Sequence, residues 1–146
     1  MKYIFLDIDG VLNAPGDKNL IDGVIEPNKY SLLKDIINKT NSKVVIISSR
    51  RLYAEDRNVL LKALDDIYYS VSFISYKLLS RYRKDEIDIF LKNNPCESYV
   101  ILDDIDCDYS LDNEINKHYI YIDGITGLTA ANAKYAIEIL NNIQKT

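Results

Sequence analysis

Cysteine and long apolar runs are scarce in this sequence, and their scarcity excludes several classes of protein. The 146 residues include two cysteines, Cys96 and Cys107, which are too few for a disulfide framework and lack the spacing of a metal site. No apolar run reaches the roughly 20 residues that cross a bilayer, and Asp7 interrupts the N-terminal run too early for a signal peptide. We therefore expect free thiols, no membrane partner and a reducing compartment, the cytoplasm.

Basic residues are fewer than acidic ones, 18 against 22, and the net charge is −4 at pH 7. This charge does not indicate a broad electrostatic attraction to nucleic acid. The composition, 47% hydrophobic and 27% charged, is ordinary for a globular protein. A chain of this length buries roughly two-thirds of its unfolded surface, and no linker or repeat divides it. We expect residues 1–146 to form a single domain.

Strand and helix patterns alternate along the chain. Apolar and β-branched runs predict strands at 3–6, 43–47, 71–74, 98–102 and 118–122, of which the third is the weakest. Periodicity and capping residues predict helices at 27–39, 54–64, 84–92 and from a Thr129 cap to about 143. The segment 13–26 is typical of a loop or short hairpin. The alternation predicts an α/β fold, a Rossmann-like three-layer sandwich with a central parallel sheet covered on both faces.

Two carboxylates end the first predicted strand. Asp7 and Asp9 point the same way, because side chains of an extended chain alternate with period two, and Gly10 permits a tight turn after them. Two like charges side by side are unfavourable unless a cation or a shared proton relieves them. Oxygen-only ligands of this kind suit Mg²⁺. Taken alone, the pair is equally compatible with a solvated turn at the end of a strand.

Other chemically useful side chains also stand near strand ends. Ser48 follows the second strand, Asp103 and Asp104 follow the fourth, and Lys84 opens the helix before the fourth. The carboxyl ends of the strands in a doubly wound sheet meet at one edge, where ligands bind. Four acids, a hydroxyl and a lysine at that edge would hold a divalent cation and a phosphate together.

Four stretches resemble, in the expected order, the motifs of the haloacid dehalogenase (HAD) superfamily. Asp-Ile-Asp-Gly-Val-Leu at 7–12 resembles the first motif, and Val-Val-Ile-Ile-Ser at 44–48 resembles the second. Lys84 resembles the third motif, and Ile-Leu-Asp-Asp at 101–104 resembles the fourth. The resemblance implies a phosphatase, because dehalogenases of this superfamily lack the second aspartate of the first motif, whereas phosphatases keep it.

The resemblance also implies catalytic roles. Asp7 would be the nucleophile that forms an aspartyl-phosphate, and Asp9 would be the general acid and then the general base. Ser48, with the Ser49 backbone amide, would bind a phosphate oxygen. Lys84 would neutralise the charge on Asp7 and on the phosphate.

Mg²⁺ is the cofactor that the resemblance implies. Asp103 and Asp104, directly or through water, would complete the metal shell alongside Asp7 and the Asp9 carbonyl. Which of Asp103 and Asp104 is the direct ligand stays open. Asp108, four residues beyond Asp104, has a spacing that some relatives use for a second acid.

Other assignments within the motifs also stay open. Ser49 is the alternative to Ser48 as the phosphate ligand, and Arg83 and Arg81 are the alternatives to Lys84. Asp106 and Asp112 are expected to be solvated loop charges, and His118 is expected to have a structural role.

The gaps between motifs leave no room for a cap domain. The segment 10–43 holds a loop and a helix, and the segment 51–84 holds a helix, a strand and a connector. In this superfamily a capless, open site goes with large substrates such as phosphoproteins, polynucleotide ends or bulky nucleotides.

A narrower resemblance points to nucleic-acid ends. Ser48-Ser49-Arg50 is similar to the Ser-Gly-Arg stretch of 3′-phosphatase domains in some polynucleotide kinase-phosphatases, where the arginine contacts phosphate. Lys-Asp-Glu-Ile at 84–87 is similar to a stretch there, and the tail 122–129 resembles the ending of small HAD domains of RNA-repair proteins. The residues expected at the substrate are Ser49, Arg50 and Gly10. A local basic rim would be formed by Arg50, Arg51, Lys77, Arg81 and Arg83.

The leading hypothesis is a Mg²⁺-dependent phosphomonoesterase that acts through an aspartyl-phosphate on an accessible, large substrate: a nucleotide, a nucleic-acid end or a phosphoprotein. The first alternative is a 3′-phosphatase or related end-healing enzyme on RNA or DNA. The second is a non-catalytic phosphate- or Mg²⁺-binding regulatory protein, against which the intact Asp7–Asp9 pair argues. A receiver-type domain ranks lower, because its acceptor would stand where this chain has Ser48. A basic patch near Arg50 and Arg83 on the surface would favour a nucleic-acid substrate. An acidic rim there would instead favour a small or protein substrate.

Overall fold

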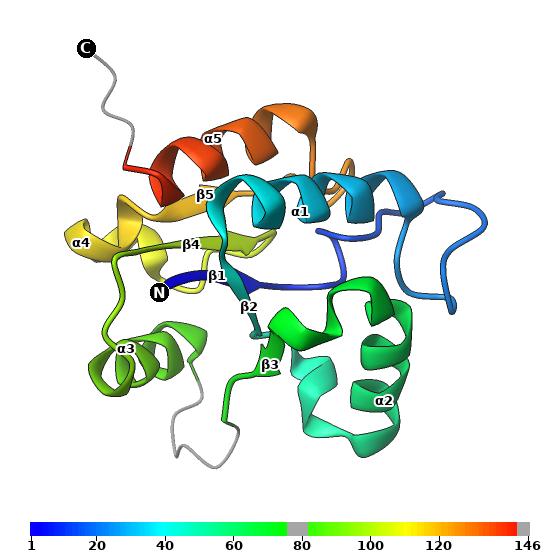
Figure 1. Ribbon diagram of the computed structural model, residues 1–146, viewed down its shortest axis with the longest axis horizontal. Helices are drawn as coiled ribbons and strands as arrows, with labels where there is room; N and C mark the ends of the chain where they lie inside the picture. The colour runs from blue at the N-terminus through cyan, green and yellow to red at the C-terminus, as the bar shows by residue number, and fades with distance from the viewer. Residues whose placement is uncertain (76–81, 143–146) are drawn as a thin grey trace.

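The architecture is a parallel sheet between two layers of helices. The computed structural model describes residues 1–75 and 82–142 (Figure 1). Its strands are β1 (Lys2–Leu6), β2 (Lys43–Ile46), β3 (Val71–Phe73), β4 (Ser98–Asp103) and β5 (Tyr119–Tyr121). They pair in the order β3-β2-β1-β4-β5, and every pairing is parallel. The predicted α/β fold with a parallel sheet is confirmed.

Helices cover both faces of this sheet. The longer helices are α1 (Pro27–Thr40), α2 (Ala54–Ala63), α3 (Arg83–Asn93) and α5 (Ala130–Leu140). The shorter ones are α4 (Asn113–Asn116) and the 3₁₀ turns η1 (Ser49–Leu52), η2 (Asp65–Ser70) and η3 (Tyr109–Leu111). Helices α1 and α5 lie side by side over one face of the sheet, and α3 lies against the other (Figure 1).

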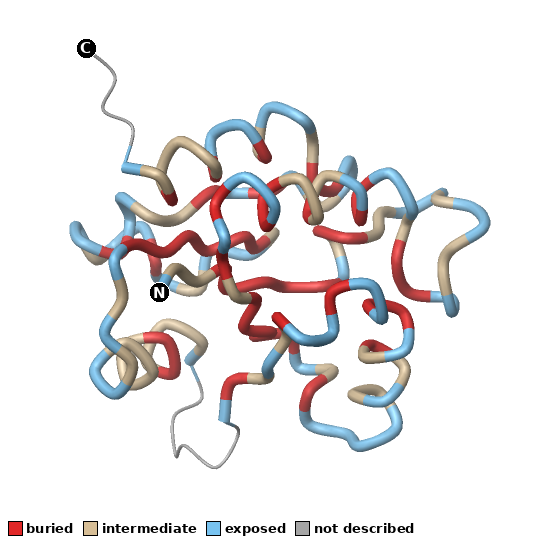
Figure 2. The backbone as a smooth tube through the Cα atoms, viewed as in Figure 1, coloured by how far each residue is buried: buried red, intermediate tan, exposed pale blue. Residues whose placement is uncertain are grey.

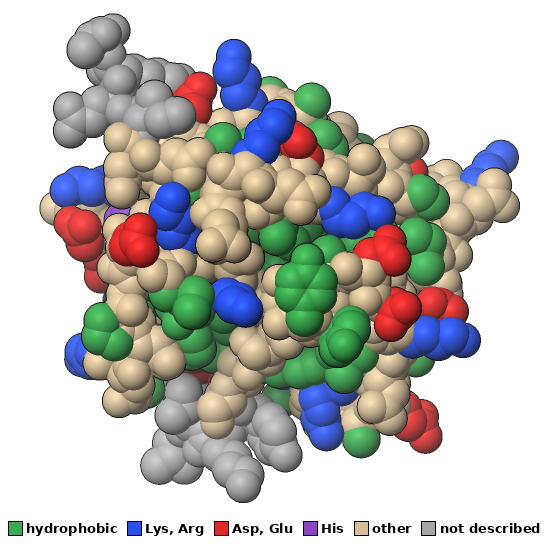
Figure 3. Space-filling model, viewed as in Figure 1, with side chains coloured by type: hydrophobic (Ala, Val, Ile, Leu, Met, Phe, Trp, Pro, Cys, Tyr) green, Lys and Arg blue, Asp and Glu red, His purple; other side chains and the backbone are tan. Residues whose placement is uncertain are grey.

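Alternating side chains of the strands fill two apolar cores. Ile4 and Leu6 of β1 pack with apolar residues of α1, α2 and α5 on one face, and Phe5 packs with Ile87 of α3 on the other. The inner strands are therefore buried over most of their length (Figure 2), which explains their continuous apolar runs. Acidic and basic side chains are interspersed on the face that Figure 3 shows.

Local sequence signals explain where the helices begin. Pro27 occupies the first turn of α1, where Glu26 accepts hydrogen bonds from backbone amides. Thr129 and Asn132 form a capping box at the start of α5. That helix ends at Leu140, and its predicted end at residue 143 lies outside the described residues. The short α4 and the 3₁₀ turns were not predicted, because so few residues carry no periodic signal.

The segments after β1 and β2 contain loops, turns and short elements. Residues 7–26 form a loop with one antiparallel bridge, between Ile21 and Ile25. Between β2 and α3 stand η1, α2, η2 and β3. No domain is inserted at either place within the described ranges. Of the helices in residues 1–75 and 82–142, none has the length and apolar character needed to cross a membrane.

The carboxyl ends of the three inner strands meet at one edge of the sheet. Leu6 of β1 pairs in register with Ile46 of β2 and Leu102 of β4. The amide of Asp7 donates to the Leu102 carbonyl at 3.0 Å, and the amide of Ile47 donates to the Leu6 carbonyl at 3.0 Å. The polar residues that follow these strands therefore emerge close together.

Candidate functional site

Three aspartates form a cluster at this edge. Asp7 follows β1, Asp103 ends β4, and Asp104 comes next. One carboxylate oxygen from each lies within 4.8 Å of the others. Asp7 is 4% exposed and Asp103 is fully buried. Of the four acids predicted to meet at this edge, these three do so in their geometry, and Asp9 does not join them.

A guanidinium group balances part of this negative charge. Arg83 Nη1, from the first residue of α3, lies 3.3 Å from Asp7 Oδ2 and donates to both carboxylate oxygens of Asp103, at 2.9 and 3.0 Å. Burial raises the pKa of Asp7 and of Asp103, and the charge of Arg83 opposes this effect at both. Burial also opposes the charge of Arg83, but Asp7 and Asp103 outweigh it, so the pKa of Arg83 is raised.

Asp103 is held by further donors. The Tyr109 hydroxyl donates to Asp103 Oδ2 at 3.0 Å, and the Ile105 amide donates to Oδ1 at 3.1 Å. Tyr109 is itself fully buried. Its role was not predicted, because a tyrosine in a loop after a strand carries no distinctive signal.

Asp104 has unused hydrogen-bonding capacity. Its Oδ1 atom is buried and has no hydrogen-bond partner among residues 1–75 and 82–142. A Cβ atom at Gly10 would overlap the Asp104 carboxylate, and one at Gly124 would lie 2.9 Å from Asp104 Oδ2. Gly10 also has a φ of +82°, which other residues rarely adopt. The two glycines thus leave room for the Asp104 carboxylate beside the cluster's other two acids.

The donor set fits a hard divalent cation. Its side-chain ligands are carboxylates alone, one of them has an unsatisfied buried oxygen, and one guanidinium cannot neutralise three acids. Asp7, Asp103 and Asp104 are the residues that would hold the ion.

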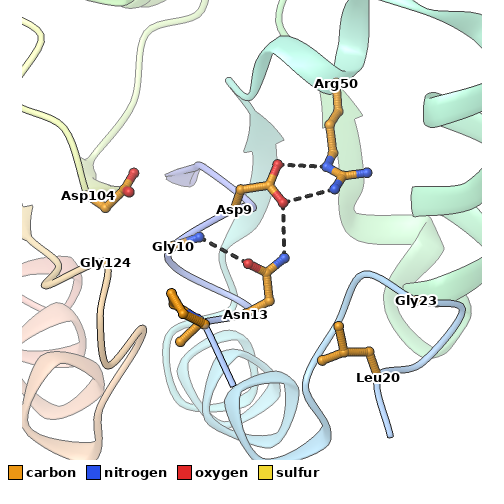
Figure 4. Close-up of a pocket in the computed structure, with 10 residues that line it drawn as sticks. Asp9, Gly10, Asn13, Leu20, Gly23, Arg50, Asp104 and Gly124 are labelled. Carbon is orange, nitrogen blue, oxygen red and sulfur yellow. Dashed lines mark hydrogen bonds and ion pairs between the residues drawn. The ribbon is translucent and has the colours of Figure 1, made fainter. Parts of the chain in front are cut away.

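The expectation that Asp7 and Asp9 point the same way is wrong: β1 ends at Leu6, so the period-two rule does not extend to Asp9, and its side chain lies outside the cluster. Its carboxylate accepts from Arg50 Nε at 2.7 Å and Nη2 at 2.9 Å, and from Asn13 Nδ2 at 3.2 Å (Figure 4). These hydrogen bonds, those of Arg50 above all, lower the pKa of Asp9. The Asp9 side chain is not among the three clustered carboxylates, and the expected contribution of its carbonyl to a metal stays a prediction.

Ser48 and Ser49 lie where β2 ends. The Ser48 side chain is 2% exposed and accepts from the Arg50 amide at 3.2 Å, which caps η1. Ser49 is the exposed first residue of η1. The Ser48 hydroxyl keeps its own proton for donation, so Ser48 can still bind a phosphate oxygen. The choice between Ser48 and Ser49 as the phosphate ligand therefore stays open.

The expected contact between Lys84 and Asp7 is not made, and Arg83 takes that place. Lys84 Nζ instead lies 3.2 Å from Asp88 and 3.4 Å from Asp112. Helix α3 begins at Arg83, and successive helical residues point about 100° apart, so only one of the two can face Asp7. Arg81, the other alternative, lies outside the described residues.

The remaining acids and the histidine occupy peripheral positions. Asp108 is exposed, with a φ of 63°, and does not join the three-acid cluster. Asp106 is exposed and accepts hydrogen bonds from Ser110. Asp112 caps α4. His118 stacks on Tyr99 with ring centroids 3.9 Å apart, in the structural position expected of it.

The predicted basic rim is not free in the part of the chain that the structure describes. Arg50 pairs with Asp9, Arg51 is buried against Glu86, and Arg83 is held between two aspartates. The other two members, Lys77 and Arg81, lie outside the described residues. Exposed acids follow Asp104 in the sequence at Asp106 and Asp108, and Asp9 is exposed as well.

A cavity of about 470 Å³ opens beside Asp9 and Asp104 (Figure 4). Its walls come from the loop after β1, from Arg50, and from Gly124 after β5. Asn13 braces that loop, because it bonds Asp9, the Gly10 amide at 3.1 Å and the Val24 carbonyl at 2.8 Å. Asn13 was not predicted to belong to the site.

Comparison with known proteins identifies a family. The model of a family described as the HAD domain in Swiss Army Knife RNA repair proteins matches residues 3–133. A search of curated proteins finds no significant match. HAD domains generally use Mg²⁺, in agreement with the carboxylate cluster.

Addition of Mg²⁺ should raise the melting temperature of the native protein. At ten times its Kd, Mg²⁺ would stabilise the fold by ~1.4 kcal/mol, because it binds the assembled cluster and not the unfolded chain. Asp104→Asn should abolish the shift in differential scanning fluorimetry. Asp106→Asn, a matched change outside the cluster, should retain it. Equal shifts in both variants would contradict a site at the cluster.

Proposed function

The chain belongs to the family of HAD domains found in Swiss Army Knife RNA repair proteins, and we propose that it is a Mg²⁺-dependent phosphomonoesterase that works through an aspartyl-phosphate. Membership of the family suggests phosphatase-type activity. The observation that carries the finer proposal is the buried Asp7, which lies beside Arg83 and is one of the three clustered acids.

In the first step, an Asp7 oxygen attacks phosphorus as the ester P–O bond breaks, and Asp9 protonates the departing alkoxide. In the second step, Asp9 takes a proton from water, whose oxygen attacks phosphorus and releases Asp7 and inorganic phosphate. Arg83 stabilises negative charge on Asp7 and on the phosphoryl oxygens. A bound Mg²⁺ would supply electrostatic stabilisation of the phosphoryl group.

Arg50 links substrate binding to the proton on Asp9. Its two hydrogen bonds to Asp9 keep the pKa of that carboxyl low, which is unfavourable for a general acid. A phosphate bound at the Ser48–Arg50 turn would compete for the same guanidinium. Once Arg50 turns to phosphate, the pKa of Asp9 rises and the carboxyl can hold the proton that the leaving group needs.

The physiological substrate that we favour is the phosphorylated end of RNA. The family description and the similarity of Ser48-Ser49-Arg50 to 3′-phosphatases support this choice. The cavity of about 470 Å³ has room for one terminal nucleoside. The described residues show no free basic rim near Arg50 and Arg83, which by the criterion set from the sequence counts against nucleic acid, so the proposal is confined to recognition of the phosphorylated end and includes no extended polyanion-binding surface.

Asp7→Asn should abolish Mg²⁺-dependent hydrolysis of p-nitrophenyl phosphate, with a loss on the order of 10³-fold or more, because the amide cannot form the covalent intermediate. Initial rates with and without Mg²⁺ on native and variant protein measure this. Retained activity in Asp7→Asn would contradict the mechanism. A folded native protein that binds phosphorylated oligonucleotides without turnover would support the non-catalytic alternative.

Arg83→Met should lower kcat by about 10²- to 10³-fold, because it removes a preorganised cation from the nucleophile and phosphate. Lys84→Met, the neighbouring change, should leave kcat within about threefold, since Lys84 contacts acids outside the cluster. Arg83→Lys keeps the positive charge, so activity that it retains would show that the loss in Arg83→Met comes from the missing charge and not from unfolding. The reverse order of the two methionine variants would restore Lys84 to the role first predicted for it.

A 3′-phosphorylated RNA oligonucleotide should be hydrolysed faster than its 5′-phosphorylated counterpart, by about 10-fold or more. Leu20→Trp, which fills the cavity from its wall, should slow RNA hydrolysis more than p-nitrophenyl phosphate hydrolysis. Leu111→Trp, on an exposed residue outside that cavity, is the matched control. Equal rates on both RNA ends in the native protein would exclude this substrate preference.

A further inference from the structure

A buried ion pair joins α3 to the turn that follows β2. Arg51, in η1, donates from Nη2 to the Glu86 carboxylate in α3, and the two residues are 6% and 5% exposed. Neither residue touches the three-acid cluster, and the mechanism above uses neither. We propose that Arg51 and Glu86 are positioning residues that hold the Ser48–Arg50 turn and Arg83 in register for phosphoryl transfer. This inference rests on the proposed function.

The Arg51 guanidinium fixes the backbone on both sides of Ser48. Its Nη1 atom donates to the Ile47 carbonyl at 2.9 Å and to the Ser48 carbonyl at 3.1 Å. The Arg51 amide donates to the same Ser48 carbonyl at 3.1 Å. One side chain therefore sets the direction in which the Ser48 hydroxyl and the following amides point. Those are the groups that the proposed function assigns to phosphate.

Glu86 connects this turn to the cation beside the nucleophile. Glu86 lies three residues after Arg83 on α3, so both side chains leave the same face of the helix. Arg83 pairs with Asp7 and Asp103 after β1 and β4, while Glu86 pairs with Arg51 after β2. The first turn of α3 is thus fixed to the ends of three neighbouring strands.

The chemistry of the pair favours a geometric role over a stabilising one. A buried ion pair gives little net stability compared with apolar side chains of similar volume, because both charges lose their hydration. It does demand one arrangement, since either charge left alone in the interior is costly. A guanidinium is also suited to the place, because its planar fork serves a carboxylate and two carbonyls together, which an ammonium group does less well.

The test uses Glu86→Gln and Arg51→Lys, two changes that keep the volume of the side chain. Each should lower kcat for Mg²⁺-dependent hydrolysis of p-nitrophenyl phosphate by about 10- to 100-fold, because misplaced groups lose alignment, and should change KM less. In NMR hydrogen exchange, the Arg51 amide and the first turn of α3 should exchange faster, while α1 keeps its native rates. Ile36→Val, in the core of α1, is the control and should leave kcat unchanged.

The outcomes separate this inference from the proposed function. Unchanged kcat and unchanged local exchange in both variants would overturn the inference. A uniform rise in exchange that includes α1, with native kcat per folded molecule, would reduce the pair to a stabilising contact and also overturn it. If the native protein does not hydrolyse phosphomonoesters, the proposed function fails. The inference then fails with it, and locally faster exchange near Arg51 and α3 would show only that the pair holds the turn to the helix.

Discussion

The site depends on one arrangement of charge: the Arg83 guanidinium between the buried carboxylates of Asp7 and Asp103. The two acids end neighbouring strands, so the parallel pairing of β1 with β4 brings them together whatever the surrounding loops do. Burial raises the pKa of both carboxyl groups, and the charge of Arg83 opposes that rise, which favours the ionised carboxylate that a nucleophile requires. The start of helix α3 matters for this reason, because its first residue, Arg83, lies beside Asp7 at the end of β1.

A single guanidinium leaves the cluster with more negative than positive charge. Asp104 adds a third carboxylate, and Gly10 and Gly124 make the space for it. The loops after β1 and β5 are thus shaped by the same electrostatic requirement as α3. A divalent cation is the simplest way to satisfy the remaining charge and the unpartnered Asp104 oxygen, and it would at the same time attract a phosphate dianion to the edge where Asp7 stands.

The sequence predicts well those features that depend on local pattern, and poorly those that depend on side-chain direction. The inner strands are mostly apolar runs, so the parallel sheet and the convergence of Asp7, Asp103 and Asp104 at one edge follow from pattern, whereas the order of the strands does not. The choice between Lys84 and Arg83 does not follow from pattern, because both lie about one turn before the inward-facing Ile87, on either side of its direction, and the sequence does not fix how α3 is rotated about its axis. The pairing of Arg50 with Asp9 joins residues 41 positions apart, and no spacing rule indicates it.

The internal use of basic residues bears on how such a protein could act on nucleic acid. Arg50, Arg51 and Arg83 all neutralise acids of the same chain, so few described cations near the site remain to contact a run of phosphates. A polyanion gains affinity mainly by contacts at many phosphates, and this surface offers few. A terminal phosphate differs from an internal one, because it is a dianion and can approach a recessed nucleophile. Selectivity for an end would then come from access and charge at one phosphate, without a long binding groove.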